Sequence, residues 1–213
     1  MKPKLLYCLT LVLSGGLNCP AAIIYPNAPD GGQQVIHEAF KGLSRSISRY
    51  LGGCQIEDLT IANPFRDYAV GLTNLVSGQL LPEARVGTWR YLLMHGTNAV
   101  GAAELMADPA NGAALKFANL DTTDFSKETQ EALRRAESLP QIQKQDYELR
   151  RLDCPSALFV AIWLHGKSDD ILIPLPPTGG RWNAWQPYSE RRMIELLQPE
   201  AEKRLKTGSG IFN

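Results

Sequence analysis

The chain has 213 residues, of which 44 % are hydrophobic and 21 % are charged, and its 22 basic residues balance its 22 acidic ones. These values are ordinary for a globular protein with a hydrophobic core, and the length favours one domain or two small ones. With no net charge and no basic stripe or tail, the chain lacks the electrostatic signature of a nucleic-acid-binding protein and that of a protein held on an anionic membrane surface.

The N-terminus has the three-part pattern of a secretory signal peptide. Lys2 and Lys4 precede an apolar run over residues 5–13, and small alanines follow at 21–22. The run is shorter than the about 20 apolar residues that a membrane span needs, so no integral membrane segment is expected in the mature chain. We therefore expect residues 1–22 to be a cleaved signal peptide and the protein to be exported, to a bacterial periplasm or out of the cell.

Four cysteines are present, and two of them, Cys8 and Cys19, belong to that leader. Lipid attachment at Cys19 is a less favoured alternative, because Asn18 occupies the position where bacterial lipoproteins usually carry a small residue. Cys54 and Cys154 remain in the mature chain, and two cysteines in an oxidising compartment most often pair. We expect a disulfide between them; two separate buried thiols and a nucleophilic cysteine are the alternatives.

Two helices are predicted at the start of the mature chain. Apolar residues over 36–50 follow helical spacing, and Gly52 and Gly53 supply a stop. A second helix is predicted over residues 63–76, because Asn63 is a good cap and a proline follows it at the first helical position.

The middle of the chain is predicted to hold antiparallel strands at residues 89–95, 99–107 and 113–120. The second of these segments is rich in alanine and other helix formers, so a helix is the alternative. The turn-forming residues 108–112 favour the strand, because proline fixes one φ angle and Asn-Gly accepts positive φ.

The second half is predicted to contain a surface helix, three more strands and a last helix, at residues 127–138, 147–153, 157–164, 171–175 and 189–205. Two sets of side chains alternate along the strand at 147–153, which is typical of an exposed strand. The strand at 157–164 is continuously apolar, which is typical of a central strand with both faces covered. Pro174 indicates that the third strand lies at an edge.

Separate runs of strands and helices predict an α+β fold, with a mainly antiparallel sheet of about six strands covered by helices. We expect a single domain over residues 23–207, followed by a flexible tail at 208–213. The sequence of residues 91–96 resembles that of residues 161–166. The match is so short that chance explains it better than an internal duplication does.

The candidates for catalysis are two histidines. His95 and His165 both end apolar strands just before a glycine, so their rings would meet if these strands were neighbours; a histidine bonded to a backbone carbonyl is the plainer alternative. Cys154 would lie at the opposite end of a strand from His165, roughly 33 Å away at about 3.3 Å per residue, which argues against a Cys–His hydrolase. None of the spacings typical of zinc sites or phosphate-binding loops occurs, so neither a metal nor a cofactor is expected.

The most unusual local stretch is the aromatic segment 181–188, which contains Arg181, Trp182, Trp185 and Tyr188. Exposed rings beside amide side chains can stack on sugars or grip a peptide. This segment is therefore the predicted binding surface for a protein, peptide or glycan partner in the cell envelope. The alternative is that the tryptophans lie in the core, where aromatic side chains are most often found.

Together these features predict an exported, non-catalytic binding or envelope-associated protein. The alternative is an extracytoplasmic hydrolase in which His95 or His165 works with a cysteine or a carboxylate.

Overall fold

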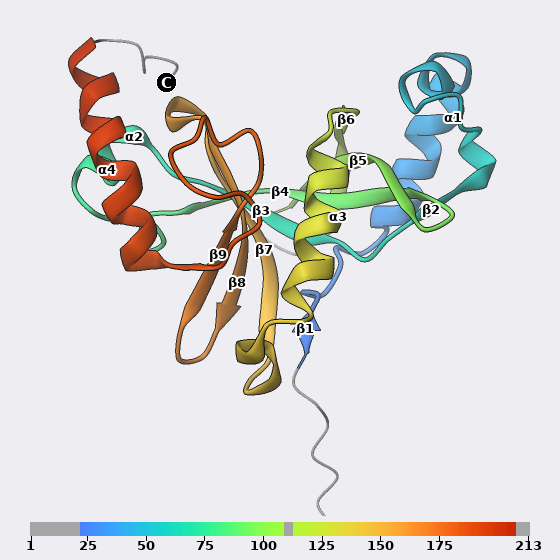
Figure 1. The fold of residues 1–213 in the computed structure, drawn as a ribbon. Helices are drawn as coiled ribbons and strands as arrows, with labels where there is room; N and C mark the ends of the chain where they lie inside the picture. The colour runs from blue at the N-terminus through green and yellow to red at the C-terminus, as the bar shows by residue number, and fades with distance from the viewer. Residues whose placement is uncertain (1–21, 109–112, 208–213) are drawn as a thin grey trace, which may run out of the picture.

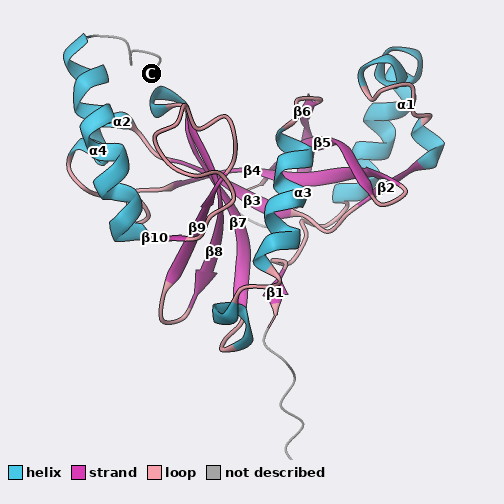
Figure 2. Ribbon diagram, in the orientation of Figure 1, coloured by secondary structure: helices cyan, strands magenta, loops and turns pink. Residues whose placement is uncertain are grey.

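The computed structural model describes residues 22–108 and 113–207. Over these ranges the fold is α+β, with one mixed sheet of ten strands and helices packed against it (Figure 1, Figure 2). The predicted class is confirmed, but the sheet is larger than six strands and is not purely antiparallel. Nearly all of the predicted signal peptide, the tip of the turn at 108–112 and the predicted tail lie outside the described residues.

The ten strands are β1 (Ile23–Ile24), β2 (Leu59–Ile61), β3 (Phe65–Ala69), β4 (Arg85–His95), β5 (Asn98–Ala107), β6 (Ala114–Asp121), β7 (Tyr147–Cys154), β8 (Phe159–Gly166), β9 (Asp170–Pro174) and β10 (Tyr188–Ser189). The α-helices are α1 (Gly32–Tyr50), α2 (Leu72–Val76), α3 (Phe125–Ala136) and α4 (Glu190–Thr207). Short 3-10 helices are η1 (Ile56–Asp58), η2 (Pro140–Gln143) and η3 (Pro155–Ala157). The strand order is β10-β9-β8-β7-β3-β4-β5-β6, with β1 beside β7 and β2 beside β4.

One parallel pair at the centre joins two antiparallel halves of the sheet. Strands β4, β5 and β6 form one half and β7, β8 and β9 the other, with consecutive strands antiparallel in each. Strand β3 pairs antiparallel with β4 and parallel with β7. Parallel neighbours need a long connection, so this contact joins segments about 80 residues apart and leaves no local sequence pattern.

The segment predicted to be the second helix is mostly a strand, which corrects the prediction for residues 63–76. Residues 65–69 form β3, and only residues 72–76 are helical. Phe65 and Asp67 point to one face of the sheet and are both buried. A five-residue strand has too few positions for its alternation to outweigh a helical pattern, so pairing with β4 and β7 decides the conformation.

Strand β7 also differs from the expectation, because it is central and buried instead of exposed. It lies between β3 and β8, and five of its eight residues are buried. Its polar residues Arg151 and Asp153 alternate as solvated side chains would, but they form ion pairs within the protein. The predicted strands β4, β5, β6, β8 and β9 and the helices α1, α3 and α4 are confirmed, and α4 continues through Pro199.

The core consists of three apolar clusters on the two faces of the sheet. In β4, Tyr91 and Leu93 contact α1 on one face, while Leu92 points to the opposite face, which α3 covers. Helices α2 and α4 pack on the α1 face at the far end of the sheet, around Phe159 and Leu197. Figure 1 shows α2 and α4 at one end of the sheet and α1 at the other. None of the described helices is long and apolar enough to cross a membrane.

Candidate ligand-binding site

Six charged side chains from five adjacent strands meet on the face of the sheet that α3 covers. Their alternation with core residues puts them there: Arg90 is two residues from Leu92, and Asp67 is two residues from Phe65. We call this set the ionic cluster. Its members are Asp67 on β3, Arg90 on β4, Glu104 on β5, Asp121 on β6, and Arg151 and Asp153 on β7.

Arg90 is the centre of the ionic cluster. Its Nε donates a hydrogen bond to Asp67 Oδ2 at 3.1 Å, one terminal nitrogen donates to Asp121 Oδ2 at 2.7 Å, and the other pairs with Glu104. Burial raises the pKa of Asp121, but hydrogen bonds from Thr123 and Arg90 outweigh burial and hold that pKa below its usual range. The planar guanidinium, with its fixed fork of donors, is the side chain best suited to bind three carboxylates at once.

Arg151 extends the ionic cluster toward the second half of the sheet. It donates to Asp67 Oδ2 at 3.2 Å and to Asp153 Oδ2 at 3.5 Å, so that both arginines share one oxygen of Asp67. The other oxygen, Asp67 Oδ1, and Arg151 Nε are buried without a hydrogen-bond partner among the described residues. The ionic cluster thus contains hydrogen-bonding capacity that the described side chains leave unused.

The charges of the ionic cluster do not balance. Its two guanidiniums face four carboxylates, which leaves two negative charges in excess when all are ionised. Burial and neighbouring carboxylates accordingly raise the pKa of Glu104 and of Asp153, although Arg90 and Arg151 act in the opposite direction. Folding therefore favours the protonated form of these two carboxyl groups relative to the unfolded chain.

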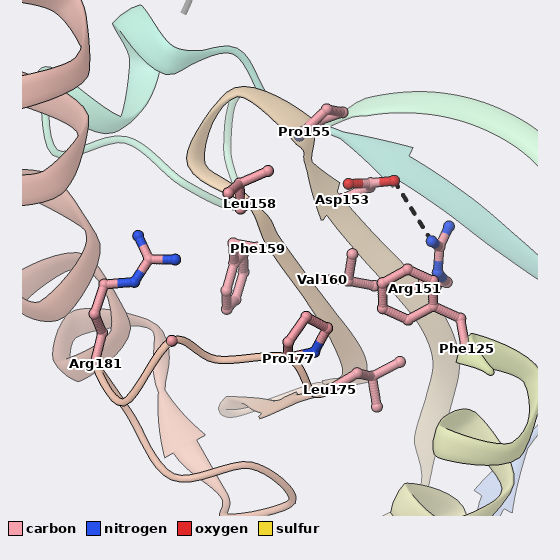
Figure 3. Close-up of a pocket in the computed structure, with 11 residues that line it drawn as sticks. Phe125, Arg151, Asp153, Pro155, Leu158, Phe159, Val160, Leu175, Pro177 and Arg181 are labelled. Carbon is pink, nitrogen blue, oxygen red and sulfur yellow. Dashed lines mark hydrogen bonds and ion pairs between the residues drawn. The ribbon is translucent and has the colours of Figure 1, made fainter. Parts of the chain in front are cut away.

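A cavity of about 400 Å³ opens beside the ionic cluster. Figure 3 shows Phe159, Val160 and Leu175 around it, with the Arg151–Asp153 pair at one side and Arg181 at the other. The lining is mostly apolar and comes from α3, β7, η3, β8 and the segment after β9; its non-polar side chains are Phe125, Pro155, Leu158, Phe159, Val160, Leu175 and Pro177. Strand β7 therefore supplies the polar end of the cavity, and β8 supplies its apolar floor.

Asp153 is the carboxylate through which the ionic cluster meets the cavity. Its side chain is 29 % exposed, whereas that of Arg151 is 6 % exposed. The contact of 3.5 Å with Arg151 is long for a charged hydrogen bond, so Asp153 keeps acceptor capacity toward the cavity.

Leu158 forms an unusual part of the apolar wall. Its φ angle is +50°, in the left-handed region that disfavours side chains with a Cβ, and it is 63 % exposed. Leu158 thus places an exposed apolar side chain at the edge of the cavity.

The structure packs the aromatic segment 181–188 into the fold. Trp182 is 5 % exposed and makes a T-shaped contact with Phe159, with ring centroids 5.5 Å apart. Trp185 packs against the cluster on the α3 face beneath Arg135, and the Tyr188 hydroxyl accepts a hydrogen bond from the backbone N–H of Asn183. Among the four predicted binding residues, Arg181 alone lines the cavity.

The two candidate histidines are not brought together. Strands β4 and β8, which carry His95 and His165, are separated by β3 and β7, so their axes lie about 14 Å apart at about 4.8 Å per strand. His95 is exposed. His165 Nδ1 lies 2.8 Å from Asp170 Oδ1, which also accepts a hydrogen bond from Trp163 Nε1.

Cys154 is remote from His165. It is paired with Phe159 across β7 and β8, six residues from His165 and therefore roughly 20 Å from it along the strand. This separation is shorter than the sequence-based figure of roughly 33 Å, since Cys154 ends β7 and is not at the start of β8. It is still far beyond hydrogen-bond reach, which catalysis between the two groups requires.

Both remaining cysteines carry free thiols in the structure. Cys154 is buried in the cluster beneath α4, and Cys54 packs against the separate cluster beneath α1. The structure thus does not contain the expected disulfide, and the pairing stays a prediction for thiol chemistry to test.

We expect the two thiols to react at different rates. Burial raises the pKa of Cys154 to about 11, so its reactive thiolate is scarce at pH 8, whereas Cys54 is half-buried. Iodoacetamide followed by peptide mass analysis should modify Cys54 in the native protein and Cys154 only after unfolding. Rapid modification of Cys154 would contradict its burial, and two thiols that react only after reduction would establish the disulfide.

Neither a metal centre nor a known relative points to a function. Within residues 22–108 and 113–207, no group of three or more His, Cys, Asp or Glu side chains is placed to hold a metal ion. No family model matches the chain, and no curated protein or solved structure is significantly similar to it. The function is therefore inferred from the cavity and the ionic cluster themselves.

Proposed function

We propose that this chain is an exported, non-catalytic binding protein that holds a small, mainly apolar ligand in the cavity beside the ionic cluster. The observation that supports this most is the cavity of about 400 Å³, with apolar walls and one hydrogen-bonding pair at its end. Small-molecule sites typically combine a concave apolar surface with a few polar groups that fix orientation. The signal-peptide pattern in the sequence supports export.

The size and lining of the cavity favour a ligand that contributes mainly buried hydrocarbon. Burial of each CH₂ group is worth about 0.8 kcal/mol, so an eight-carbon chain supplies on the order of 6 kcal/mol before the cost of immobilising it. The packing of Trp182 and Trp185 within the fold favours such a ligand over a glycan stacked on exposed rings. The Arg151–Asp153 pair would then bind the polar head of the ligand.

The fluorescent probe N-phenyl-1-naphthylamine, which brightens in apolar surroundings, tests this proposal. We expect saturable binding to the wild-type protein and about fivefold weaker binding to Leu158→Gly, because the change removes apolar wall surface. The variant should keep its thermal stability, since glycine accepts a φ of +50° without strain. The measurement is a fluorescence titration paired with a thermal melt.

Leu115→Ala is the matched control for this titration, because Leu115 is 55 % exposed on β6 and does not line the cavity. It should bind the probe as the wild type does. Equal affinity of Leu158→Gly and the wild type, or a signal that does not saturate, would show that the probe does not occupy the cavity.

A second candidate is an extracytoplasmic hydrolase that uses His165 as a general base. The contact of 2.8 Å with Asp170 favours it, because a carboxylate that orients an imidazole is a recurring part of hydrolytic sites. Hydrolysis of p-nitrophenyl acetate above the buffer rate that disappears in His165→Ala would favour this candidate over ligand binding.

A further inference from the structure

We infer that the ligand has a cationic head group, such as a protonated amine, that pairs with Asp153 at the polar end of the cavity. This inference rests on the proposed function and assigns the chemical class of the ligand.

The first support is the charge of the ionic cluster. Among the ion pairs of the described residues, only Arg90 and Arg151 supply positive charge to its four carboxylates. The two excess negative charges would attract a cationic ligand that enters the cavity. They would repel a ligand that carries a carboxylate. The interior position makes both effects stronger than they would be in water.

The second support is the unused acceptor capacity next to the cavity. Asp153 is the most exposed carboxylate of the ionic cluster and is held by one contact of 3.5 Å. Asp67, which shares Arg151 with Asp153 but does not itself line the cavity, is 8 % exposed, and its Oδ1 is buried without a hydrogen-bond partner among the described residues. An ammonium group has three donors and no acceptor, so it complements this arrangement.

The third support is that the positive charge at the other end of the cavity is already engaged. Arg181 donates hydrogen bonds to the backbone carbonyls of Thr178 and Ala157 and lies 3.4 Å from Glu200. Its guanidinium also lies over the Trp182 ring, 4.6 Å from the centroid. Arg181 therefore has little remaining capacity to attract an anionic head group to the cavity.

A matched ligand series tests the charge of the head group. n-Octylamine, 1-octanol and octanoate share one hydrocarbon chain and differ in charge, and each is titrated at pH 7 against bound N-phenyl-1-naphthylamine. We expect n-octylamine to bind with about tenfold higher affinity than 1-octanol, because a charge-assisted hydrogen bond is roughly twice as strong as a neutral one. Octanoate should have the lowest affinity of the three compounds.

Two isosteric variants locate the effect. Asp153→Asn should reduce the preference for the amine to less than about twofold, because it removes the charge that the ammonium group pairs with. Asp58→Asn removes the same charge from an exposed position on η1, away from the cavity lining, and should leave the preference unchanged. Should Asp153→Asn fail to fold, titration of the wild type at pH 4 replaces it, and the preference for the amine is expected to fall there, because the raised pKa of Asp153 lets a proton remove its negative charge at that pH.

The outcomes separate this inference from the proposal on which it rests. Equal displacement by the three compounds, tighter binding of octanoate, or an amine preference that survives in Asp153→Asn would overturn the cationic head group and leave a cavity that binds apolar molecules. Failure of all three compounds to displace the probe would overturn both.

Discussion

Replacement of Arg90 by methionine is expected to destabilise the folded protein by about 3–5 kcal/mol. Methionine keeps much of the volume of the side chain and removes its charge. The carboxylates of Asp67, Glu104 and Asp121 would then lie close together on the α3 face without the cation that pairs with all three. The loss reflects uncompensated charge in a buried site, since a buried ion pair by itself adds little net stability.

Urea unfolding of the variant and the wild type at pH 7 measures this loss. Arg134→Met is the matched control, because Arg134 pairs with Glu131 on the exposed side of α3 and such surface pairs are worth about 0–1 kcal/mol. A loss in Arg90→Met no larger than in the control would mean that the ionic cluster is not buried as the structure has it.

The stability of Arg90→Met should also depend on pH. The pKa values of Glu104 and Asp153 are raised in the folded protein, so these groups bind protons more strongly there than in the unfolded chain, and their contribution to stability falls as pH rises above their ordinary values of 4.5 and 3.8. Removal of Arg90 takes away a charge that opposes this shift for both groups. The difference in unfolding free energy between variant and wild type should therefore be smaller at pH 5 than at pH 8.

Replacement of Trp182 by alanine is expected to cost about 3–5 kcal/mol of folding stability. Trp182 is 5 % exposed, packs in the cluster that contains Met193 and Leu197, and makes its T-shaped contact with Phe159. Alanine would leave a void directly behind the cavity floor. Probe affinity should fall as well, because Phe159 loses the ring that holds it in place.

Tyr50→Ala is the control for this change, since Tyr50 is 66 % exposed at the end of α1 and its removal should alter stability by no more than about 0.5 kcal/mol. Thermal melts of both variants are the measurement. A Trp182→Ala protein with wild-type stability and no probe binding would restore the exposed aromatic surface expected from the sequence.

Elements with a long or distinct local pattern were predictable from the sequence. Helix α1 has nineteen residues with one apolar stripe, and β8 begins with six consecutive apolar residues. Strand β3 was not predictable, because its five residues also fit a helical repeat and its partner β7 lies about 80 positions further along the chain. The mixed character of the sheet follows from that pairing and from the short parallel contact of β1 with β7.

The ionic cluster escaped sequence analysis for the same reason. Its members extend from Asp67 to Asp153, and the β3–β7 pairing is what brings the two ends together. A signal was present, because Arg90 interrupts the apolar run of β4 and Glu104 interrupts the alanine-rich β5. A charged residue within a predicted buried strand needs a partner, although the pattern alone does not identify it.

The cavity was predictable only in its parts. Its lining residues Phe159, Val160 and Leu175 belong to predicted strands, but a hydrophobic residue in a strand can fill the core or line a hollow with the same local pattern. The aromatic segment 181–188 shows the converse, since clustered rings indicate importance without showing whether they are packed or exposed. Arg181 lines the cavity because of the path that the chain takes after β9. The local sequence of this segment does not predict that path.

The ligand-binding role of the cavity is tested most directly by NMR of the protein labelled at leucine and valine methyl groups, titrated with N-phenyl-1-naphthylamine. We predict that the largest chemical-shift changes will occur at Leu158, Val160 and Leu175, which line the cavity. The methyl groups of Leu115 and Leu205, which are exposed elsewhere, should remain unchanged. Unchanged cavity methyls, or changes spread equally over all five residues, would contradict a binding site between the ionic cluster and β8.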